Sequence, residues 1–208
     1  MELLKKVMGI EAKRCFVLSN AFTSKKMKKE IIKKHIIKPE KVSFLKDIKL
    51  SKERILKLEE ADLDLIIATE YKKRLKAYDS LEWHVGYVDV LEVGLWHGAG
   101  GVPESWTKGS LADTANKICN ELKKDNSRYS RIRAMNVVPE IVNFKSIIKK
   151  EKYLMPIILS GGTIVNCRRG MKKMKGDIDD GCMRSLAFAV SGDNKIKAYI
   201  GIAPKKEK

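Results

Sequence analysis

The chain has 208 residues, 44% of them hydrophobic, which is enough to bury one substantial core. Lysine and arginine outnumber aspartate and glutamate by 43 to 26, a formal net charge of +17 that repels itself unless a polyanion neutralises it. No apolar run approaches the roughly 20 residues of a membrane-spanning helix and no export signal is visible, so we expect an intracellular protein, cytoplasmic or nuclear.

Helices are expected along much of the N-terminal part, which is also rich in lysine. Thr23 or Ser24 can cap a helix that runs to about Ile36, with apolar residues on one side and lysines on the others. Pro39 ends this helix, and a second helix is predicted to begin at Ser51.

Three apolar stretches predict strands. Residues 15–18, and residues 63–69 apart from Asp64, are short apolar runs, which are typical of buried strands. Residues 81–96 are rich in valine and leucine, and they lead into a glycine-rich loop at residues 97–102. We expect this third stretch to belong to the central sheet.

A capping box gives the clearest helix signal in the chain. Ser110 stands three residues before Asp113, the spacing at which two side chains can satisfy each other's backbone N–H groups. The apolar residues that follow share one helical face: Leu111, Ala115, Ile118, Cys119 and Leu122. The pattern predicts a helix that begins at about residue 111.

The next segments predict further elements of the sheet. Residues 131–138 are expected to form a strand, and Pro139 fits the first position of a short helix. Residues 153–167 are expected to form a hairpin that turns at residues 160–162.

The C-terminal part predicts one helix and one strand. Asp179 or Asp180 is expected to cap a helix over residues 183–190, and residues 196–202 alternate apolar and other residues as a strand does. The mixed order favours an α+β fold, a single domain with a single mixed β-sheet packed with helices. Its basic, helix-rich part covers about residues 1–80, and the remainder, residues 81–208, is sheet-rich.

The densest chemical signal is a run of five cations followed at once by three carboxylates: Arg168, Arg169, Lys172, Lys173 and Lys175, then Asp177, Asp179 and Asp180. A basic loop flanked by glycines can surround phosphates, and clustered aspartates can hold a magnesium ion that bridges a scissile phosphate. Alternatively the lysines are solvated, and the aspartates balance them while capping the next helix.

Residues 177–180, with a helix and then Asp193 beyond them, resemble in part the metal-binding helix start of phage-type Holliday junction resolvases. Asp180 stands where that family has asparagine, and Arg184 is one place from the family's lysine, so we do not assign the chain to the family. The resemblance implies a magnesium-dependent nuclease. Its candidate catalytic residues are Asp177, Asp179, Asp180 and Asp193, with Asp177 and Asp179 as the metal ligands.

Two further patterns suggest contact with nucleic acid. Arg128, Arg131 and Arg133 lie along the predicted strand near Tyr129, and guanidinium groups both grip phosphates and stack on bases. Trp106 stands close to Lys108 and could stack on an unpaired base, although packing in the core is the alternative.

Other polar residues give weaker signals. Asp64, Glu70 and Lys72 imitate the acids and lysine of restriction-type nucleases at a short spacing, and ordinary surface positions explain them equally well. The four cysteines and three histidines form no metal-ligand or triad spacing, so we expect neither a zinc site nor a disulfide framework.

We therefore predict a nucleic-acid-binding protein that contacts phosphates through basic loops, without catalysis and without a cofactor. RNA or single strands are favoured over duplex DNA because no duplex-reading motif is present, and a viral packaging or transport role fits. Two alternatives stay open: the magnesium-dependent nuclease, and a basic structural protein, like a viral matrix protein, that meets an acidic membrane surface and forms a homo-oligomer. The predicted binding residues are Arg128, Arg131, Arg133, Arg168, Arg169, Lys172, Lys173, Lys175, Trp106 and Lys108.

Overall fold

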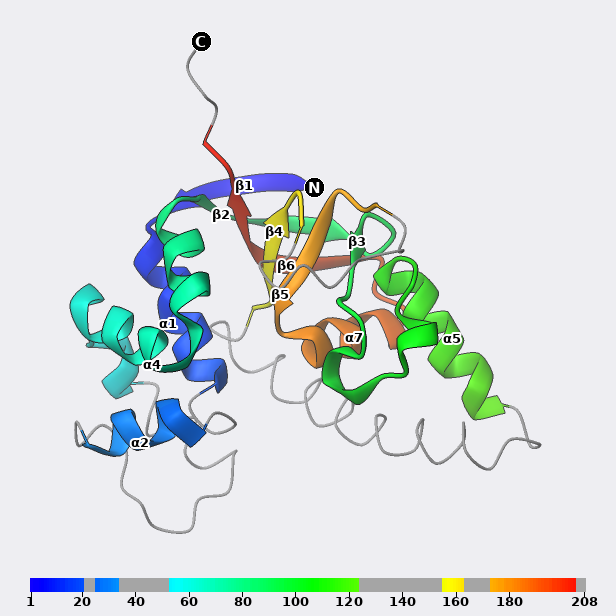
Figure 1. Cartoon of the computed structure of the whole chain (residues 1–208). Coiled ribbons are helices and arrows are strands. Elements are labelled where there is room, and N and C mark those ends of the chain that lie inside the picture. Colours follow the sequence, from blue (N-terminus) through cyan, green and yellow to red (C-terminus); the bar gives the residue numbers. More distant parts are fainter. Residues whose placement is uncertain (21–24, 34–52, 124–154, 163–172, 205–208) are drawn as a thin grey trace. The chain divides into compact units, whose positions relative to one another are not determined.

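The computed structural model describes residues 1–20, 25–33, 53–123, 155–162 and 173–204 (Figure 1). These residues form an α+β fold with a mixed six-stranded sheet, as the sequence predicts. The chain divides into two compact units. The helical unit comprises Val7–Trp83 and Ala203–Lys208, and the sheet unit comprises Met1–Lys6 and His84–Ile202.

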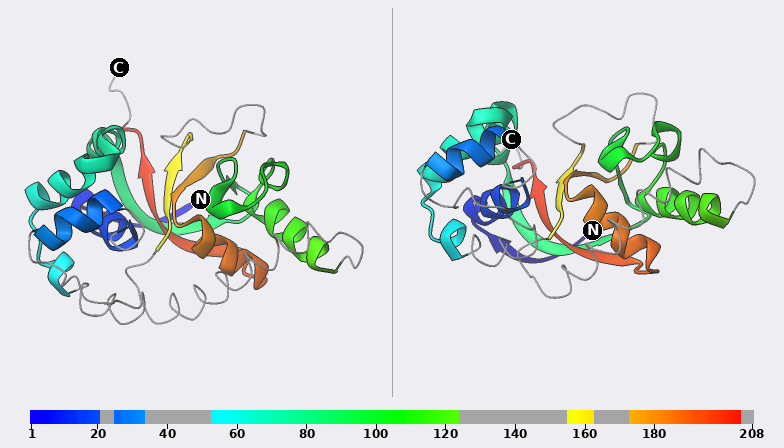
Figure 2. Two further views of the ribbon diagram at one scale, coloured as in Figure 1. Left: turned by 60° about the horizontal axis from the view of Figure 1, so that its bottom comes forward. Right: turned by 90° about the horizontal axis from the view of Figure 1, so that it is seen from below.

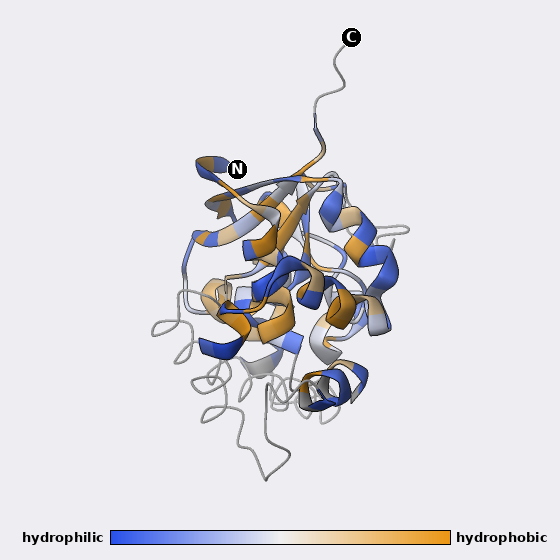
Figure 3. Ribbon diagram, turned by 90° about the vertical axis from the view of Figure 1, so that its left-hand side faces the viewer, coloured by the Kyte–Doolittle hydropathy of each residue, from blue (hydrophilic) through white to orange (hydrophobic). Residues whose placement is uncertain are grey.

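The helical unit is built from α1 (Gly9–Asn20), α2 (Lys25–Lys33) and α4 (Glu60–Asp79). In α2, Met27 and Ile31 are four residues apart and both are buried, while the lysines whose side chains are described, Lys26, Lys29 and Lys33, are exposed. The predicted lysine-rich helix is therefore confirmed over residues 25–33, and its predicted caps lie outside the described residues. The helices carry both hydrophilic and hydrophobic residues (Figure 3).

The two short strands predicted at residues 15–18 and 63–69 are wrong, because both runs lie inside helices, α1 and α4. In α4, Leu63, Ile66 and Ile67 are fully buried, whereas Leu65 is 51% exposed. This spacing of three and four residues is that of a helix with one buried side. A continuous apolar run of this length does not distinguish a buried strand from a helical segment.

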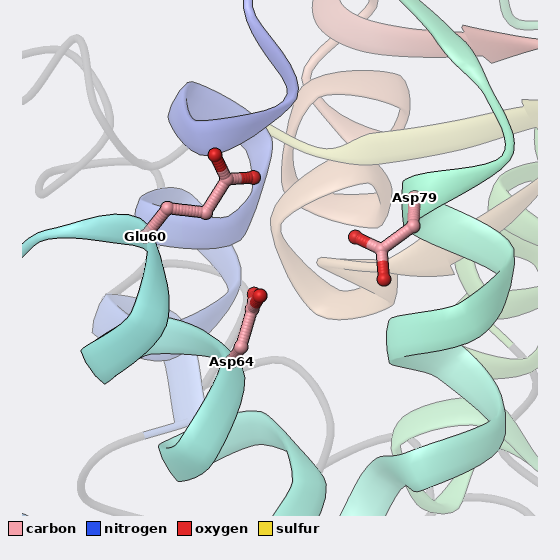
Figure 4. A group of neighbouring side chains, drawn as sticks. All are labelled: Glu60, Asp64 and Asp79. Atoms are coloured by element: carbon pink, nitrogen blue, oxygen red, sulfur yellow. The ribbon is translucent and has the colours of Figure 1, made fainter.

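A kink at Tyr71 divides α4 into two segments. The Tyr71 backbone has φ −122° and ψ 41°, outside the helical range. A straight helix of 20 residues would be about 30 Å long, yet carboxylate oxygens of Glu60 and Asp79, at its two ends, lie within 4.8 Å of each other. The second segment therefore folds back against the first, as the close-up of this region shows (Figure 4).

Aromatic rings fill the inside of this bend. Phe16 from α1 packs edge-on against Tyr71 and Tyr78, with ring centroids 5.3 and 5.8 Å apart. Tyr78 also contacts Trp83, whose Nε1 donates a hydrogen bond to the Tyr78 carbonyl oxygen at 3.0 Å. These contacts fix α1 against both segments of α4.

The sheet has the strand order β1-β2-β6-β4-β5-β3 (Figures 1 and 2). β4 is parallel to β6 and antiparallel to β5, and β5 is parallel to β3, so the sheet is mixed. The strands are β1 (Glu2–Val7), β2 (Glu82–Asp89), β3 (Val93–Gly94), β4 (Ile157–Ser160), β5 (Gly176–Asp180) and β6 (Lys195–Ile202).

Two helices, α5 (Leu111–Lys123) and α7 (Cys182–Val190), pack together and share an aliphatic core with the sheet. Ile158 and Ile178 lie opposite each other on β4 and β5 and belong to this core, as does Leu186 of α7. The predicted capping box is confirmed. The Ser110 Oγ accepts a hydrogen bond from the Asp113 N–H at 3.0 Å, and Asp113 Oδ2 accepts one from the Ser110 N–H at 2.8 Å.

The predicted strand at residues 81–96 is confirmed as β2 and β3, separated by a turn at residues 90–92. The final strand is also confirmed: β6 buries Ile196, Ala198 and Ile200. The hairpin prediction is wrong in its pairing, because β5 and β6 occupy the two edges of β4. Residues 163–167, the expected second arm of the hairpin, lie outside the described residues. The strand and the helix predicted over residues 131–148 also lie outside them.

The helix predicted at residues 183–190 is α7, but the predicted cap is wrong. Gly181 is the N-cap residue, with a left-handed φ of 85° that favours glycine. Asp179 and Asp180 instead end strand β5. The resemblance to a resolvase helix start therefore fails at its first element, because the aspartates lie on a strand.

Candidate functional site

The basic run at residues 168–175 lies in the connection between β4 and β5, which are neighbouring antiparallel strands. Ser160 at the end of β4 lies opposite Gly176 at the start of β5, and the Gly161 N–H donates a hydrogen bond to the Lys175 carbonyl at 3.2 Å. The cations of residues 168–175 thus belong to a connection whose two ends are fixed side by side on the sheet. Of these five cations, Lys173 and Lys175 lie within the described residues.

Lys175 binds a carboxylate at this end of the sheet. The Lys175 ammonium and the N-terminal ammonium of Met1 both contact Glu92, in the turn before β3, at 2.5 Å. The hydrogen bond from Lys175, followed by that from Met1, lowers the pKa of Glu92 to about 2. We call these three groups the Glu92 clamp. A phosphate that binds Lys175 must compete with Glu92.

The three aspartates of β5 lie at a β-bulge. Asp177 pairs with Leu159 and Asp180 pairs with Ile157, which places both aspartates on the face opposite to Ile178. The register shifts by one residue between these pairs, so Asp179 is the extra residue of β5.

These aspartates are largely shielded from solvent. Asp177 and Asp179 are 5% and 4% exposed, although carboxylates are rarely so buried. Arg184, itself buried, binds Asp180 at 2.7 Å from the first turn of α7. Asp193 is exposed and lies beyond the other end of α7, so a helix of nine residues, about 13 Å long, separates it from Asp180.

A second carboxylate cluster surrounds a buried lysine in the helical unit. The Lys13 ammonium lies 2.7 Å from Glu60, 2.7 Å from Asp64 and 2.6 Å from Asp79, and the lysine is 2% exposed. Figure 4 shows the three carboxylates converging from the two segments of α4. Burial lowers the pKa of Lys13, but the hydrogen bonds that its ammonium donates to the three carboxylates together raise it above its usual range.

The Lys13 cluster has the spacing of a cation site, with its three carboxylate oxygens within 4.8 Å of one another. The lysine ammonium already fills the position that a metal ion would take, and its three N–H groups are matched by three acceptors. The cluster therefore ties α1 to both segments of α4. This cluster was not predicted from the sequence. The available signal was Lys13, a charged residue next to Ala12, which is buried on α1.

Several predicted site residues have other roles. Trp106 is buried in the core of the sheet unit, as the core-packing alternative expects, whereas Lys108 is exposed. Asp64, Glu70 and Lys72 all lie on helix α4, and Asp64 binds Lys13.

The remaining predicted binding residues, Arg128, Arg131, Arg133, Arg168, Arg169 and Lys172, lie outside the described residues.

Comparison with family models, with curated proteins and with solved structures found no match to this chain. Its function is therefore argued from its own residues. In the described ranges, none of the helices combines the length and the apolar composition that crossing a membrane requires.

Proposed function

We propose that this chain binds nucleic acid, with RNA or single strands preferred, through cations concentrated in a few segments and without catalysis. The distribution of charge is the observation that carries the proposal. The described residues contain 23 lysines and arginines and 20 aspartates and glutamates, a net charge of +3. The other ranges contain 20 against 6, so they hold +14 of the total of +17.

This distribution differs from that of a protein whose whole surface has become basic. A general excess of lysine would raise the charge of the described residues as well, whereas their charge is almost balanced. Concentrated cations create a local potential that attracts a polyanion and neutralises its phosphates. The preference for single strands is supported by Tyr129, which stands among Arg128, Arg131 and Arg133 in the sequence.

The experiment measures binding of fluorescent single-stranded RNA, single-stranded DNA and duplex DNA across a salt series. One variant replaces four cations of the β4–β5 connection with glutamine and leaves Lys175 in place, because Lys175 belongs to the Glu92 clamp: Arg168, Arg169, Lys172 and Lys173. The matched control removes four exposed lysines of the helical unit: Lys57, Lys72, Lys73 and Lys76.

We expect the first variant to bind single strands more weakly and to lose up to about 3 from the slope of log K against log salt, at about 0.7 per phosphate contact. The control should change the slope much less. Equal losses in the two variants, or no binding by the unsubstituted chain at moderate salt, would contradict the proposal.

A magnesium-dependent nuclease is the second candidate, favoured by the buried aspartates at the bulge of β5. Asp177 and Asp179 would be the ligands of a magnesium ion, which would polarise the scissile phosphate. The same probes, incubated with and without magnesium, test this candidate. Shortening that needs magnesium and disappears in Asp179→Asn would establish it, whereas an intact probe supports binding without catalysis.

The membrane alternative has less support. The apolar residues of α2 that are described, Met27 and Ile31, are fully buried, and α2 packs against α4, so they offer no apolar face to a lipid surface. Flotation with phosphatidylserine vesicles, compared with neutral vesicles, tests it directly. Flotation with acidic vesicles in the absence of nucleic-acid binding would favour this alternative over the proposal.

A further inference from the structure

β1 is an edge strand whose two faces are both open. It is first in the strand order, and among the described residues its hydrogen-bonded neighbour is β2 on one side alone. Leu3 and Leu4 point to opposite faces of the sheet and are 46% and 50% exposed. At Gly86 of β2 an added Cβ would lie 2.3 Å from the Glu2 carbonyl oxygen, so β1 is seated closely against β2.

Such an edge can pair with another strand through its outward N–H and C=O groups. If the partner is β1 of a second copy, antiparallel pairing about a two-fold axis restricts the register. Residues directly opposite each other must both point their hydrogen-bonding groups toward the partner or both away from it, so they are separated by an even number of positions. The axis must therefore pass through a residue of β1 that meets its own copy.

The register centred on Leu4 gives the most complementary pairs between β1 and β1 of the second copy. Leu4 then lies opposite Leu4, Glu2 lies opposite Lys6 of the second copy, and Leu3 lies opposite Lys5, the last two pairs each occurring twice by symmetry. In the register centred on Leu3, Glu2 faces Leu4. In the register centred on Lys5, two lysines meet. The Leu4 register is therefore the one that both places opposite charges against each other and places an apolar residue against an apolar residue.

The lysines of β1 also oppose other forms of association. In a parallel, in-register stack, Lys5 meets Lys5 and Lys6 meets Lys6, and these like charges repel. Lysines on edge strands commonly prevent uncontrolled pairing in this way. The Glu2 carboxylate binds Lys195 of β6 in the same copy at 3.2 Å, and in one antiparallel register alone it also faces a lysine of the second copy and turns the repulsion into attraction.

We propose that β1 pairs antiparallel with β1 of a second copy, centred on Leu4, and joins two sheets into one continuous sheet. This interface does not depend on the proposed function. A pair of six-residue strands buries less than the roughly 1,200 Å² of a typical stable interface, and each copy carries +17. The dimer is therefore weak, and it forms at high protein concentration.

The first test mixes two variants that each disfavour pairing with themselves. Glu2→Lys places lysine opposite Lys6, and Lys6→Glu places glutamate opposite Glu2. Sedimentation velocity should show a dimer for the unsubstituted chain, monomers for each variant alone, and recovery of the dimer in the mixture. A chain that is monomeric throughout the concentration series, or a dimer that neither substitution weakens, overturns the proposal.

The second test does not depend on charge and covers the case in which a charge variant fails to fold. Opposed residues in an antiparallel pair have Cα atoms about 4.5–5.5 Å apart, a distance that a disulfide can span. Leu4→Cys should therefore give a covalent dimer on mild oxidation. Leu91→Cys is the control, because Leu91 is 64% exposed but lies in the turn after β2. Equal cross-linking of the control, or of the unsubstituted chain, overturns the assigned register.

Discussion

The helical unit and the sheet unit are stabilised by different kinds of centre. In the helical unit a charged lysine, Lys13, contacts three carboxylates, and aromatic side chains pack against one another between α1 and α4. In the sheet unit, α5 and α7 bury a mainly aliphatic layer against the sheet, and the ionic groups lie at the bulge and at the Glu92 clamp. In the helical unit, a large contribution to stability is therefore concentrated in one charged residue and its three partners. In the sheet unit, the contribution of the apolar core is spread over many residues.

The largest expected effect is in the aliphatic core. Leu186→Ala removes a fully buried side chain of α7 and leaves a cavity, so the free energy of unfolding should fall by about 3 kcal/mol. Urea denaturation followed by circular dichroism measures the loss, and it should be the same from pH 6 to pH 9 because no charge is involved. Leu91→Ala, at an exposed position, is the control. A pH-dependent loss would contradict the assignment of this centre as apolar.

A smaller loss, with a different pH dependence, is expected at the charged centre. Lys13→Met leaves three carboxylates without their cation, and because those carboxylates are partly exposed we expect a loss of about 2 kcal/mol. The pKa of Lys13 is raised in the folded state, so its contribution is fully present below the ordinary lysine pKa of about 10.4 and declines as pH rises above it. Lys26→Met, on the exposed side of α2, is the matched control.

The measurement is urea denaturation of the two methionine variants and the unsubstituted chain from pH 7 to pH 11. The difference between the unsubstituted chain and Lys13→Met should stay constant to about pH 10 and then narrow. A constant difference throughout would show that Lys13 contributes by packing and not by charge, and an equal loss in Lys26→Met would show that the loss is not specific to the cluster.

The smallest effect is expected at the Glu92 clamp. The pKa of Glu92 is lowered to about 2 in the folded state, so its contribution is present above the ordinary glutamate pKa and is lost as pH falls from about 4.3 to about 2. Because Lys175 is largely exposed, we expect Glu92→Gln to cost about 1 kcal/mol at pH 7. Acid titration of both chains checks the result: their stabilities should converge toward pH 2.

Local signals in the sequence predicted those elements whose contacts are also local. The capping box of Ser110 and Asp113 joins residues three positions apart, and the first half of β6 alternates exposed lysines with buried apolar residues, so the sequence predicts both elements correctly. The run at residues 63–69 was misread because it is apolar enough for a strand, and its helical period appears only once Leu65 is known to be exposed.

The candidate sites were harder to predict because they depend on long-range contacts. Lys13 meets Glu60 and Asp79 only because α4 bends at Tyr71, and no motif in the sequence marks that bend. The aspartates of residues 177–180 were recognised as a cluster, but their place on a bulged strand depends on pairing with β4, about 20 residues earlier in the chain.

The order of the strands gives the helical unit a particular place in the chain. β1 and β2 are neighbours in the sheet, and Val7–Trp83 connects them where a short turn would suffice. Topologically, the helical unit is an insertion within a strand connection, a position at which proteins accommodate whole inserted modules because the two chain ends lie close together. The sheet keeps its strand order whatever that connection contains, so the two units are free to diverge separately in sequence and in role.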